Sequence, residues 1–198
     1  MKIDVLLEPD QTPEQLVELA KLCEQAGIQT MWLQNYLSSR DAFLSLVPAV
    51  LATSQLRLGV CIVSSYEMHP VKMANALLTL NEYAKGRAGL VIGGGGEWML
   101  RLGMKTDKRI TAVRESIEMV KRSSADKPLA YHGQVFKVYG FQPKYATDPA
   151  PLVYAGAIFG GLVADRYIGY QRSILIGAVI MALGLFLISI PNQDVFKL

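Results

Sequence analysis

The sequence predicts an α/β fold in which strands and helices alternate along a parallel sheet. Short apolar runs rich in β-branched residues begin at Ile3, Thr30, Leu56 and Ala88, which are 27, 26 and 32 residues apart. A helical pattern fills each gap between them. Such alternation is typical of βα units, because parallel neighbours need a crossover connection. The runs fit either an open doubly wound sheet or a closed (β/α)8 barrel, and the pattern alone does not separate the two.

The first helix has the clearest boundaries. Thr12 is the expected N-cap, Pro13 takes the first helical position and Gln15 completes a capping box. Gly27 ends this helix. The spacing of apolar residues predicts three more helices, with starts near Asp41, Pro70 and Lys108.

A hairpin is expected over residues 130–140, and the run from Leu152 reads as a fifth strand. About four to five βα units therefore occupy the first part of the chain, whereas a complete barrel needs about 200 to 250 residues. A partial barrel leaves an open sheet edge and exposed strand faces. A homodimer would cover them, although no sequence feature specifies one.

Composition excludes several classes of protein. A net charge of +3 with scattered Lys and Arg gives no nucleic-acid footprint. Cys23 and Cys61 have neither metal-ligand nor disulfide spacing, so we expect buried thiols in a reducing compartment and no metal site. The apolar core of the first residues is too short for a signal peptide, which predicts a cytoplasmic protein.

Ligands bind at the carboxyl ends of strands in either architecture. The fourth strand ends in four glycines, Gly93 to Gly96, where a flat ring or a phosphate could approach the backbone. A plain flexible turn is the alternative interpretation. Glu97 follows as a candidate general base or an exposed helix-start carboxylate. His69, before Pro70, is more typical of a loop histidine than of a catalytic acid.

Several motifs together resemble the luciferase-like monooxygenase superfamily, nearest to its deazaflavin-dependent reductases and their flavin-dependent relatives. They are RDAF from Arg40, LG at 58–59, HP at 69–70 and GR at 86–87. The resemblance runs from Ile3 to about Ala157. It implies that residues 1–156 form a partial TIM-like (β/α)8 barrel. It also implies an oxidoreductase that uses FMN or a deazaflavin coenzyme for hydride transfer or monooxygenation of a small organic substrate.

The resemblance also implies a set of site residues. A non-prolyl cis peptide in a bulge of the third strand would back the cofactor ring, and by position it joins Cys61 to Ile62. The implied cofactor-binding residues are Asn35, Cys61, Ile62, Ser64, Gly95 and Gly96.

Two residues are the implied catalytic ones. Glu97 matches an acidic position of one branch, and Tyr36 is the remaining hydrogen-bond donor after the second strand. The reductases often have Asp-His where this chain has Asn35-Tyr36, which puts their proton donor in doubt here. Strands six to eight, which bind much of the phosphate tail in the family, have no counterpart.

The end of the chain has a different character. Residues 173–190 carry no charge, which predicts a transmembrane helix and membrane contact, with a buried core helix as the alternative. The segment GGLVADRYIGYQR resembles a cytoplasmic loop of the major facilitator superfamily, in its proton-dependent oligopeptide transporter branch. Residues 157–198 are therefore expected to be a transmembrane-type helical hairpin. A transporter fragment, or a non-functional chimera of the two families, is the alternative function.

Overall fold

Five strands form one parallel sheet whose spatial order follows the sequence. The computed structural model describes residues 3–95 and 97–156. The strand order is β1-β2-β3-β4-β7, and every neighbouring pair is parallel. The bounds of these strands are β1 (Asp4–Leu7), β2 (Thr30–Gln34), β3 (Arg57–Ser64), β4 (Ala88–Gly93) and β7 (Leu152–Ala155).

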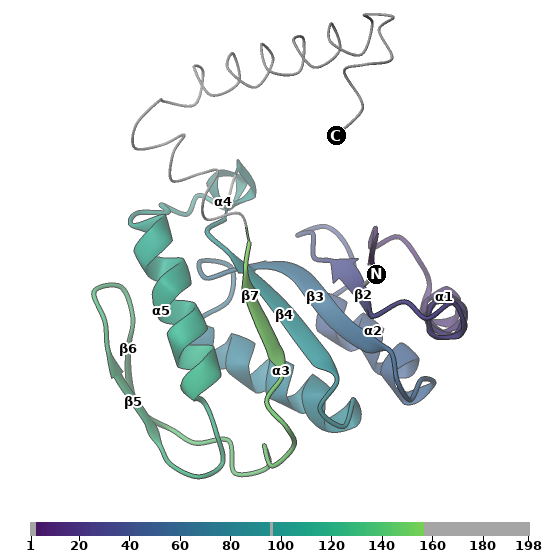
Figure 1. The fold of residues 1–198 in the computed structure, drawn as a ribbon. Helices are drawn as coiled ribbons and strands as arrows, with labels where there is room; N and C mark the ends of the chain where they lie inside the picture. Colours follow the sequence, from purple (N-terminus) through teal and green to yellow (C-terminus); the bar gives the residue numbers. More distant parts are fainter. Residues whose placement is uncertain (1–2, 96, 157–198) are drawn as a thin grey trace, which may run out of the picture. The chain divides into compact units, whose positions relative to one another are not determined.

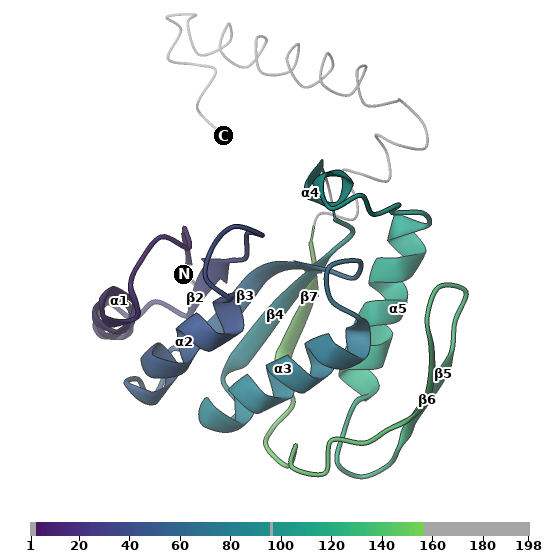
Figure 2. The same ribbon diagram turned by 180° about the vertical axis from the view of Figure 1, so that it is seen from behind.

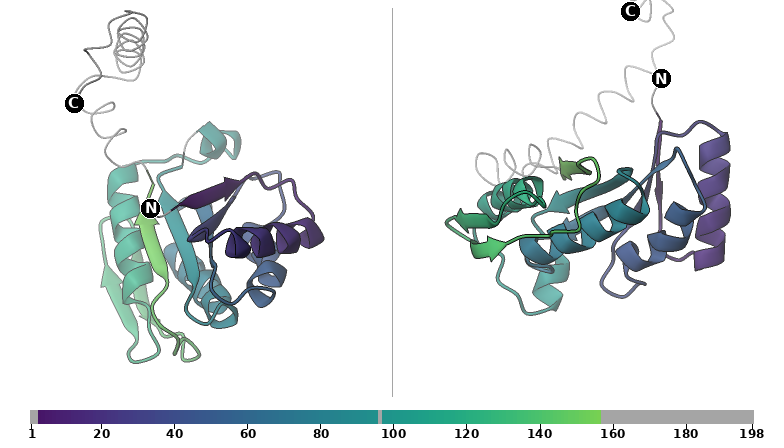
Figure 3. Two further views of the ribbon diagram at one scale, coloured as in Figure 1. Left: turned by 45° about the vertical axis from the view of Figure 1, so that its right-hand side comes forward. Right: turned by 90° about the horizontal axis from the view of Figure 1, so that it is seen from below.

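Four longer helices connect the strands and lie side by side along the sheet in the order α1, α2, α3, α5. Helices α2 and α3 lie behind the sheet in Figure 1 and in front of it in Figure 2. The view from below in Figure 3 shows the same layer following the curved sheet. The bounds are α1 (Pro13–Gln25), α2 (Ala42–Leu51), α3 (Pro70–Tyr83) and α5 (Arg109–Arg122), with a short α4 (Glu97–Arg101) after β4.

Sheet order and helix placement decide between the two architectures that the sequence left open. A doubly wound sheet reverses its strand order and carries helices on both faces. Here the order never reverses, and one helical layer covers one face. The described residues therefore form a singly wound parallel sheet, the arrangement found in (β/α)8 barrels.

The helix-facing side of the sheet forms the main core. Alternate side chains of the central strands point into it and are at most 1% exposed; they are Met31, Leu33, Leu58, Val60, Leu90 and Ile92. The capping box predicted for α1 is confirmed. Gln15 N–H donates to Thr12 Oγ1 at 3.3 Å, and Thr12 N–H donates to Gln15 Oε1 at 2.9 Å. Local capping chemistry and burial thus agree on where this helix begins.

The other side of the sheet, called the inner face below, is organised by Trp32. A Cβ added at Gly59 would lie 2.3 Å from Trp32 Cζ3, and one at Gly89 would lie 2.9 Å from Trp32 Cη2. The indole therefore occupies the space above two glycines on β3 and β4. Its Nε1 donates to Asp4 Oδ2 at 3.1 Å, and its ring meets that of Tyr154 edge-on with centroids 6.0 Å apart.

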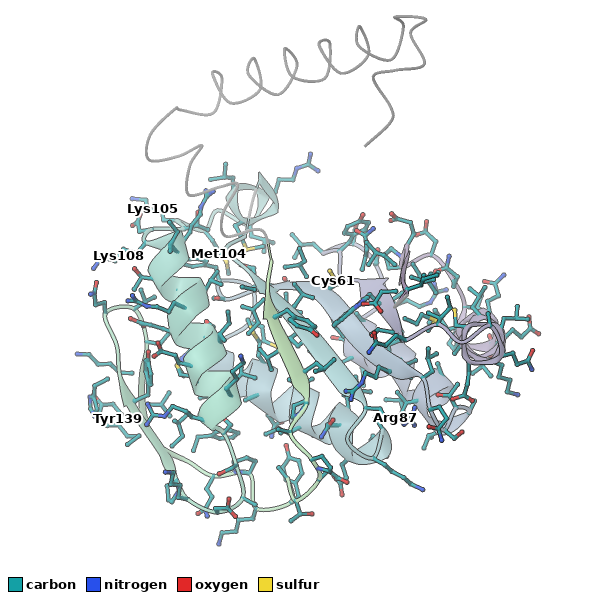
Figure 4. The ribbon with its side chains drawn as sticks, in the orientation of Figure 1. Cys61, Arg87, Met104, Lys105, Lys108 and Tyr139 are labelled. Carbon is teal, nitrogen blue, oxygen red and sulfur yellow. The ribbon has the colours of Figure 1, made fainter. Side chains whose placement is uncertain are left out.

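Two side chains stabilise the end of the sheet where the strands begin. Glu24 on α1 accepts hydrogen bonds there, and Arg87, just before β4, donates them. Glu24 accepts the backbone N–H groups of residues 54–56, and these bonds, that from Gln55 first, hold its pKa below the ordinary value. Arg87 donates to the carbonyl oxygens of Val50, Thr53 and Leu56. These bonds fix the α2–β3 turn between its neighbours, at the end of the sheet where Figure 4 labels Arg87.

A hairpin docks on α5. Its strands are β5 (Leu129–His132) and β6 (Lys137–Phe141), close to the predicted 130–140. The buried carboxylate of Glu115 accepts the backbone N–H groups of residues 134–136 at 2.7 to 3.0 Å. Burial alone would raise the pKa of Glu115, but the bonds from Phe136, Gln134 and Val135 outweigh it and lower that pKa. The hairpin turn is therefore fastened to the helix by one charged acceptor.

The transmembrane-type segment predicted for residues 157–198, with its membrane contact through 173–190, lies outside the described residues. Within 3–95 and 97–156, none of the helices is both long and apolar enough to cross a bilayer.

We expect Gly59→Ala to destabilise the fold by about 1–3 kcal/mol, because the new methyl group would overlap the indole of Trp32. Urea denaturation measures the change. The matched control is the same substitution in a Trp32→Leu background, where the cost should be clearly smaller. An equal cost in both backgrounds would show that Trp32 does not set the requirement for glycine.

We expect Glu115→Gln to lower the free energy of unfolding at pH 7 by about 1–3 kcal/mol, because three backbone donors lose a charged acceptor. The folded pKa of Glu115 lies below its ordinary value of 4.5, so the unfolded chain binds more protons in this range. The stabilisation is therefore complete above pH 4.5 and is lost as the pH falls through the folded pKa. Denaturation at pH 7, 5, 4 and 3 should show the gap between wild type and variant closing. A gap that stays constant with pH contradicts this account.

Candidate active site

All five strands are parallel, so their carboxyl ends lie together at one end of the sheet, called the carboxyl edge. Arg87 lies at the opposite end, where the strands begin. Figure 4 shows Cys61 toward this edge and Arg87 toward the other. Parallel neighbours bring together the residues that end β2, β3 and β4, because Gln34 pairs with Cys61 and Ser64 pairs with Gly93. Most of the residues expected to bind a cofactor are therefore neighbours in space.

A bulge near the end of β3 aims one apolar side chain at this edge. Cys61 pairs with Val91 and Val63 pairs with Ile92, so Ile62 is the extra residue of the bulge. The Cys61–Ile62 peptide bond is cis, which confirms the bond that the resemblance implied at this position.

The Ile62 side chain lies over the carboxyl ends of β4 and β7. A Cβ at Gly93 would be 2.4 Å from Ile62 Cγ2, and a Cβ at Gly156 would be 3.2 Å from Ile62 Cδ1. The side chain nevertheless remains 43% exposed. Glycine at both positions therefore makes room for an apolar platform at the carboxyl ends of β4 and β7.

The glycine run after β4 is shaped by its neighbours. Gly95 has a φ of +68°, and a Cβ there would lie 2.5 Å from Met99 Cγ and 2.7 Å from Ser64 Oγ. A side chain is thus excluded by both backbone conformation and space, which a merely flexible turn does not require. Gly96 and the side chain of Glu97 lie outside the described residues. The backbone of Glu97 begins α4 immediately beyond this turn.

Asn35 connects β2 to the loop after β3. Its backbone N–H donates to the carbonyl oxygen of Cys61 at 3.1 Å, and its side-chain Nδ2 donates to Glu67 Oε1 at 2.9 Å. The other oxygen of Glu67 accepts the backbone N–H of Ser64 at 3.5 Å. Sequence reasoning missed Glu67; the available signal was a carboxylate three residues beyond a strand end, inside a segment that already held Ser64.

Tyr36 lies on the β1 side of Asn35, beside Glu8. Partial burial raises the pKa of Tyr36, and the hydrogen bond to Glu8 and its charge raise it further. Glu8 also accepts a hydrogen bond from Gln34 Nε2 at 2.7 Å. At neutral pH the phenol therefore keeps its proton and can donate it in a hydrogen bond to the neighbouring Glu8 carboxylate.

The opposite flank is basic. Lys105 and Lys108 are exposed near the start of α5 in Figure 4. Arg109 packs beside the turn after β4, because a Cβ at Gly94 would lie 3.2 Å from Arg109 Cβ. The hydroxyl of Tyr66 donates to the carbonyl oxygen of Asp107, which ties this segment to the loop after β3. The edge thus has carboxylates near β1 to β3 and cations near α5.

His69 and the cysteines have structural surroundings. His69 is the N-cap of α3, where its Nδ1 accepts a hydrogen bond from the backbone N–H of Val71 at 3.2 Å. Its ring meets that of Phe136 edge-on, with the ring centroids 5.4 Å apart. Burial raises the pKa of the thiols of Cys23 and Cys61, so both stay protonated at neutral pH. The described residues contain no cluster of three or more His, Cys, Asp or Glu side chains that could hold a metal ion.

Comparison with known proteins identifies the family. The sequence profile of the luciferase-like monooxygenase family matches residues 1–163. The chain belongs to the luciferase-like monooxygenase family. Its fold and its strand-end cluster agree with that membership, since sites in (β/α)8 barrels lie at the carboxyl ends of the strands.

Its curated relatives include 5,10-methylenetetrahydromethanopterin reductases. The chain is 29% identical over 158 residues to the 5,10-methylenetetrahydromethanopterin reductase of Archaeoglobus fulgidus, covering 79% of this chain and 47% of the relative. It is 25% identical over 158 residues to the reductase of the same name from Methanolobus tindarius, covering 79% and 48%. The chain therefore spans about half the length of these luciferase-like relatives.

Solved structures share the fold. The coenzyme F420-dependent tetrahydromethanopterin reductase of Methanopyrus kandleri matches with a TM-score of 0.70 and 22% identity, covering 82% of this chain and 52% of that one. The oxygenating constituent of 3,6-diketocamphane monooxygenase from Pseudomonas putida, in complex with FMN, matches with a TM-score of 0.60 and 19% identity, covering 84% and 56%. The fold of this chain is thus shared by a coenzyme F420-dependent reductase and by an FMN-bound monooxygenase.

We expect Glu8→Gln to lower the pKa of Tyr36 toward its ordinary value of 10.0, because the variant removes the charge of Glu8 and its carboxylate acceptor. NMR of tyrosine labelled with ¹³C at Cζ follows the titration, and Tyr36→Phe assigns the signal. Glu18→Gln, a charge removal at an exposed position on α1, is the control and should leave the signal unchanged. A titration insensitive to Glu8→Gln would separate Tyr36 from this carboxylate.

Proposed function

We propose that this chain provides the ring-binding part of an oxidoreductase site that uses FMN or a deazaflavin coenzyme and acts on a small organic substrate. The observation that carries the proposal is the exposed Ile62 platform, set beside a glycine turn at the carboxyl ends of the strands. Family membership supports the same reading. When bound, such a cofactor supplies a hydride or, for a reduced flavin, the activation of oxygen.

The residues at the edge fit a flat heteroaromatic ring. Ile62 offers an apolar surface of branched carbon, while Gly93 to Gly95 present backbone without side chains. Cys61 is half-buried on the same bulge, with a protonated thiol. Sites for such ligands are mostly apolar with a few placed polar groups, which matches this set.

Polar groups at β2 and α4 are proposed to perform the proton chemistry. Tyr36 holds a proton on its hydroxyl, and Glu8 accepts a hydrogen bond from it. Glu97 is proposed as the acid or base on the opposite side, since the backbone of α4 begins there. Asn35 contributes an amide between these groups and the bulge. Hydride transfer and monooxygenation both require a proton to be moved near the reacting atoms.

The transporter and chimera alternatives rest on residues 157–198, and no observation on the described residues favours them. The reductase relatives favour hydride transfer with a deazaflavin, whereas the FMN-bound monooxygenase favours oxygen chemistry.

A homodimer is proposed as the assembly that would cover the inner face. Size-exclusion chromatography with light scattering measures the mass of the full chain.

We expect the full chain to bind FMN or coenzyme F420, detected by the change in cofactor fluorescence on titration. Ile62→Asp should weaken binding at least tenfold, because it places a charge against the ring. Leu44→Asp, at a position 73% exposed on α2, is the matched control and should bind as the wild type does. Binding of neither cofactor to the wild type would overturn the proposal, as would equal binding by the Ile62 and Leu44 variants.

A further inference from the structure

Glu67 bonds to two parts of the candidate site at once. The loop after β3 turns back on itself, with the N–H groups of Glu67 and Met68 donating to the carbonyl oxygen of Ser64 at 3.1 and 3.0 Å. This turn returns the Glu67 carboxylate to the strand ends. There one oxygen accepts from Asn35 Nδ2 at 2.9 Å and the other from Ser64 N–H at 3.5 Å.

The charge of Glu67 dictates which way the Asn35 amide faces. An ionised carboxylate only accepts hydrogen bonds, so the amide nitrogen must be the atom turned toward it. The amide oxygen of Asn35 consequently points away from Glu67. In the part of the chain that the structure describes, this oxygen has no hydrogen-bond donor. It is an acceptor left open at the edge where β2 ends.

The same carboxylate also steadies the segment that carries the apolar platform. Ser64 is two residues beyond Ile62, is only 5% exposed, and its Oγ accepts the backbone N–H of Tyr66 at 3.2 Å. Of the two bonds that Glu67 accepts, the one from Asn35 at 2.9 Å has the length of a strong charge-assisted bond, and the one from Ser64 at 3.5 Å is long and weaker. Glu67 thus links the Asn35 amide, one residue beyond the end of β2, to the segment that follows the bulge on β3.

We propose that Glu67 is a positioning residue: by holding the side-chain amide of Asn35, it presents Asn35 Oδ1 to an N–H group of the bound cofactor ring. This inference rests on the proposed function. It predicts that a ligand able to donate an N–H from its ring edge is held by Asn35, and that Glu67 acts through Asn35 without touching the ligand.

Fluorescence titration of the full chain with FMN and with coenzyme F420 tests the coupling. Glu67→Ala should weaken binding about tenfold, and Asn35→Ala by a similar factor. The double variant should bind within about twofold of Asn35→Ala alone, because two residues acting in series are not additive. Glu67→Gln, which keeps an acceptor oxygen, should restore much of the affinity.

The matched control is Glu118→Ala. Glu118 also accepts a side-chain hydrogen bond, from the hydroxyl of Tyr131 at 2.7 Å, but it lies on the hairpin side of α5. Its loss should leave cofactor binding at the wild-type value. Wild-type affinity in Glu67→Ala, or independent losses that multiply in the double variant, would overturn the inference.

A second readout needs no cofactor. In the NMR spectrum of the ligand-free chain, one of the two Asn35 side-chain amide protons should be shifted and protected by the Glu67 carboxylate. Glu67→Ala should abolish this signature and Glu118→Ala should not. If the wild type binds neither cofactor, the proposed function fails. The amide signals then still decide about Glu67, because a signature unchanged by Glu67→Ala refutes the positioning role.

Discussion

The position of one indole ring constrains most of this sheet. Trp32 contacts four other strands from the inner face: it donates to Asp4 on β1, lies over Gly59 on β3 and Gly89 on β4, and meets Tyr154 on β7. It is only 8% exposed, although the described helices cover the opposite face. The glycines and the indole are a matched set, because the ring fills the volume that their side chains would take.

The packing around Trp32 continues toward the carboxyl ends of the strands. Side chains inside parallel barrels are arranged in layers along the strands. Trp32 forms one layer, and Cys61 and Ile62 follow toward the carboxyl edge, where Gly93 and Gly156 again give room for a larger neighbour. The apolar platform of the candidate site therefore continues the inner-face packing, and both large side chains, Trp32 and Ile62, lie against glycines of neighbouring strands.

Features encoded by neighbouring residues could be predicted from the sequence. The cap at Thr12, the helix after Pro70 and the hairpin near residues 129–141 depend on local spacing, and the structure has all three. The bulge at Ile62 was accessible only through resemblance. Sheet order, and with it the choice between a doubly wound sheet and a barrel, depends on which strands pair and is not contained in any one segment.

The contacts that define the site join distant residues. Asn35 and Glu67 are 32 residues apart, and Trp32 and Asp4 are 28 apart. Each pair forms only when two βα units are in register. Periodicity cannot detect such pairs, which is why Glu67 was missed. Asn35 was expected because the family resemblance implied it. Tyr36 was chosen for its donor group, but its neighbour Glu8 became visible only in three dimensions.

The agreement between strand order and chain order has a consequence for synthesis on the ribosome. Each strand adds to the edge left by the strand before it, so no described strand of the sheet has to wait for a partner encoded further downstream. Connections between successive strands stay within one βα unit, except the longer one to β7, which keeps the entropy lost on closing each loop small. β7 is the last of the described strands to be synthesised, and Gly156, which follows it, lies against Ile62. Among the described strands, the four that form the scaffold therefore leave the ribosome before the strand that completes the platform of the candidate site.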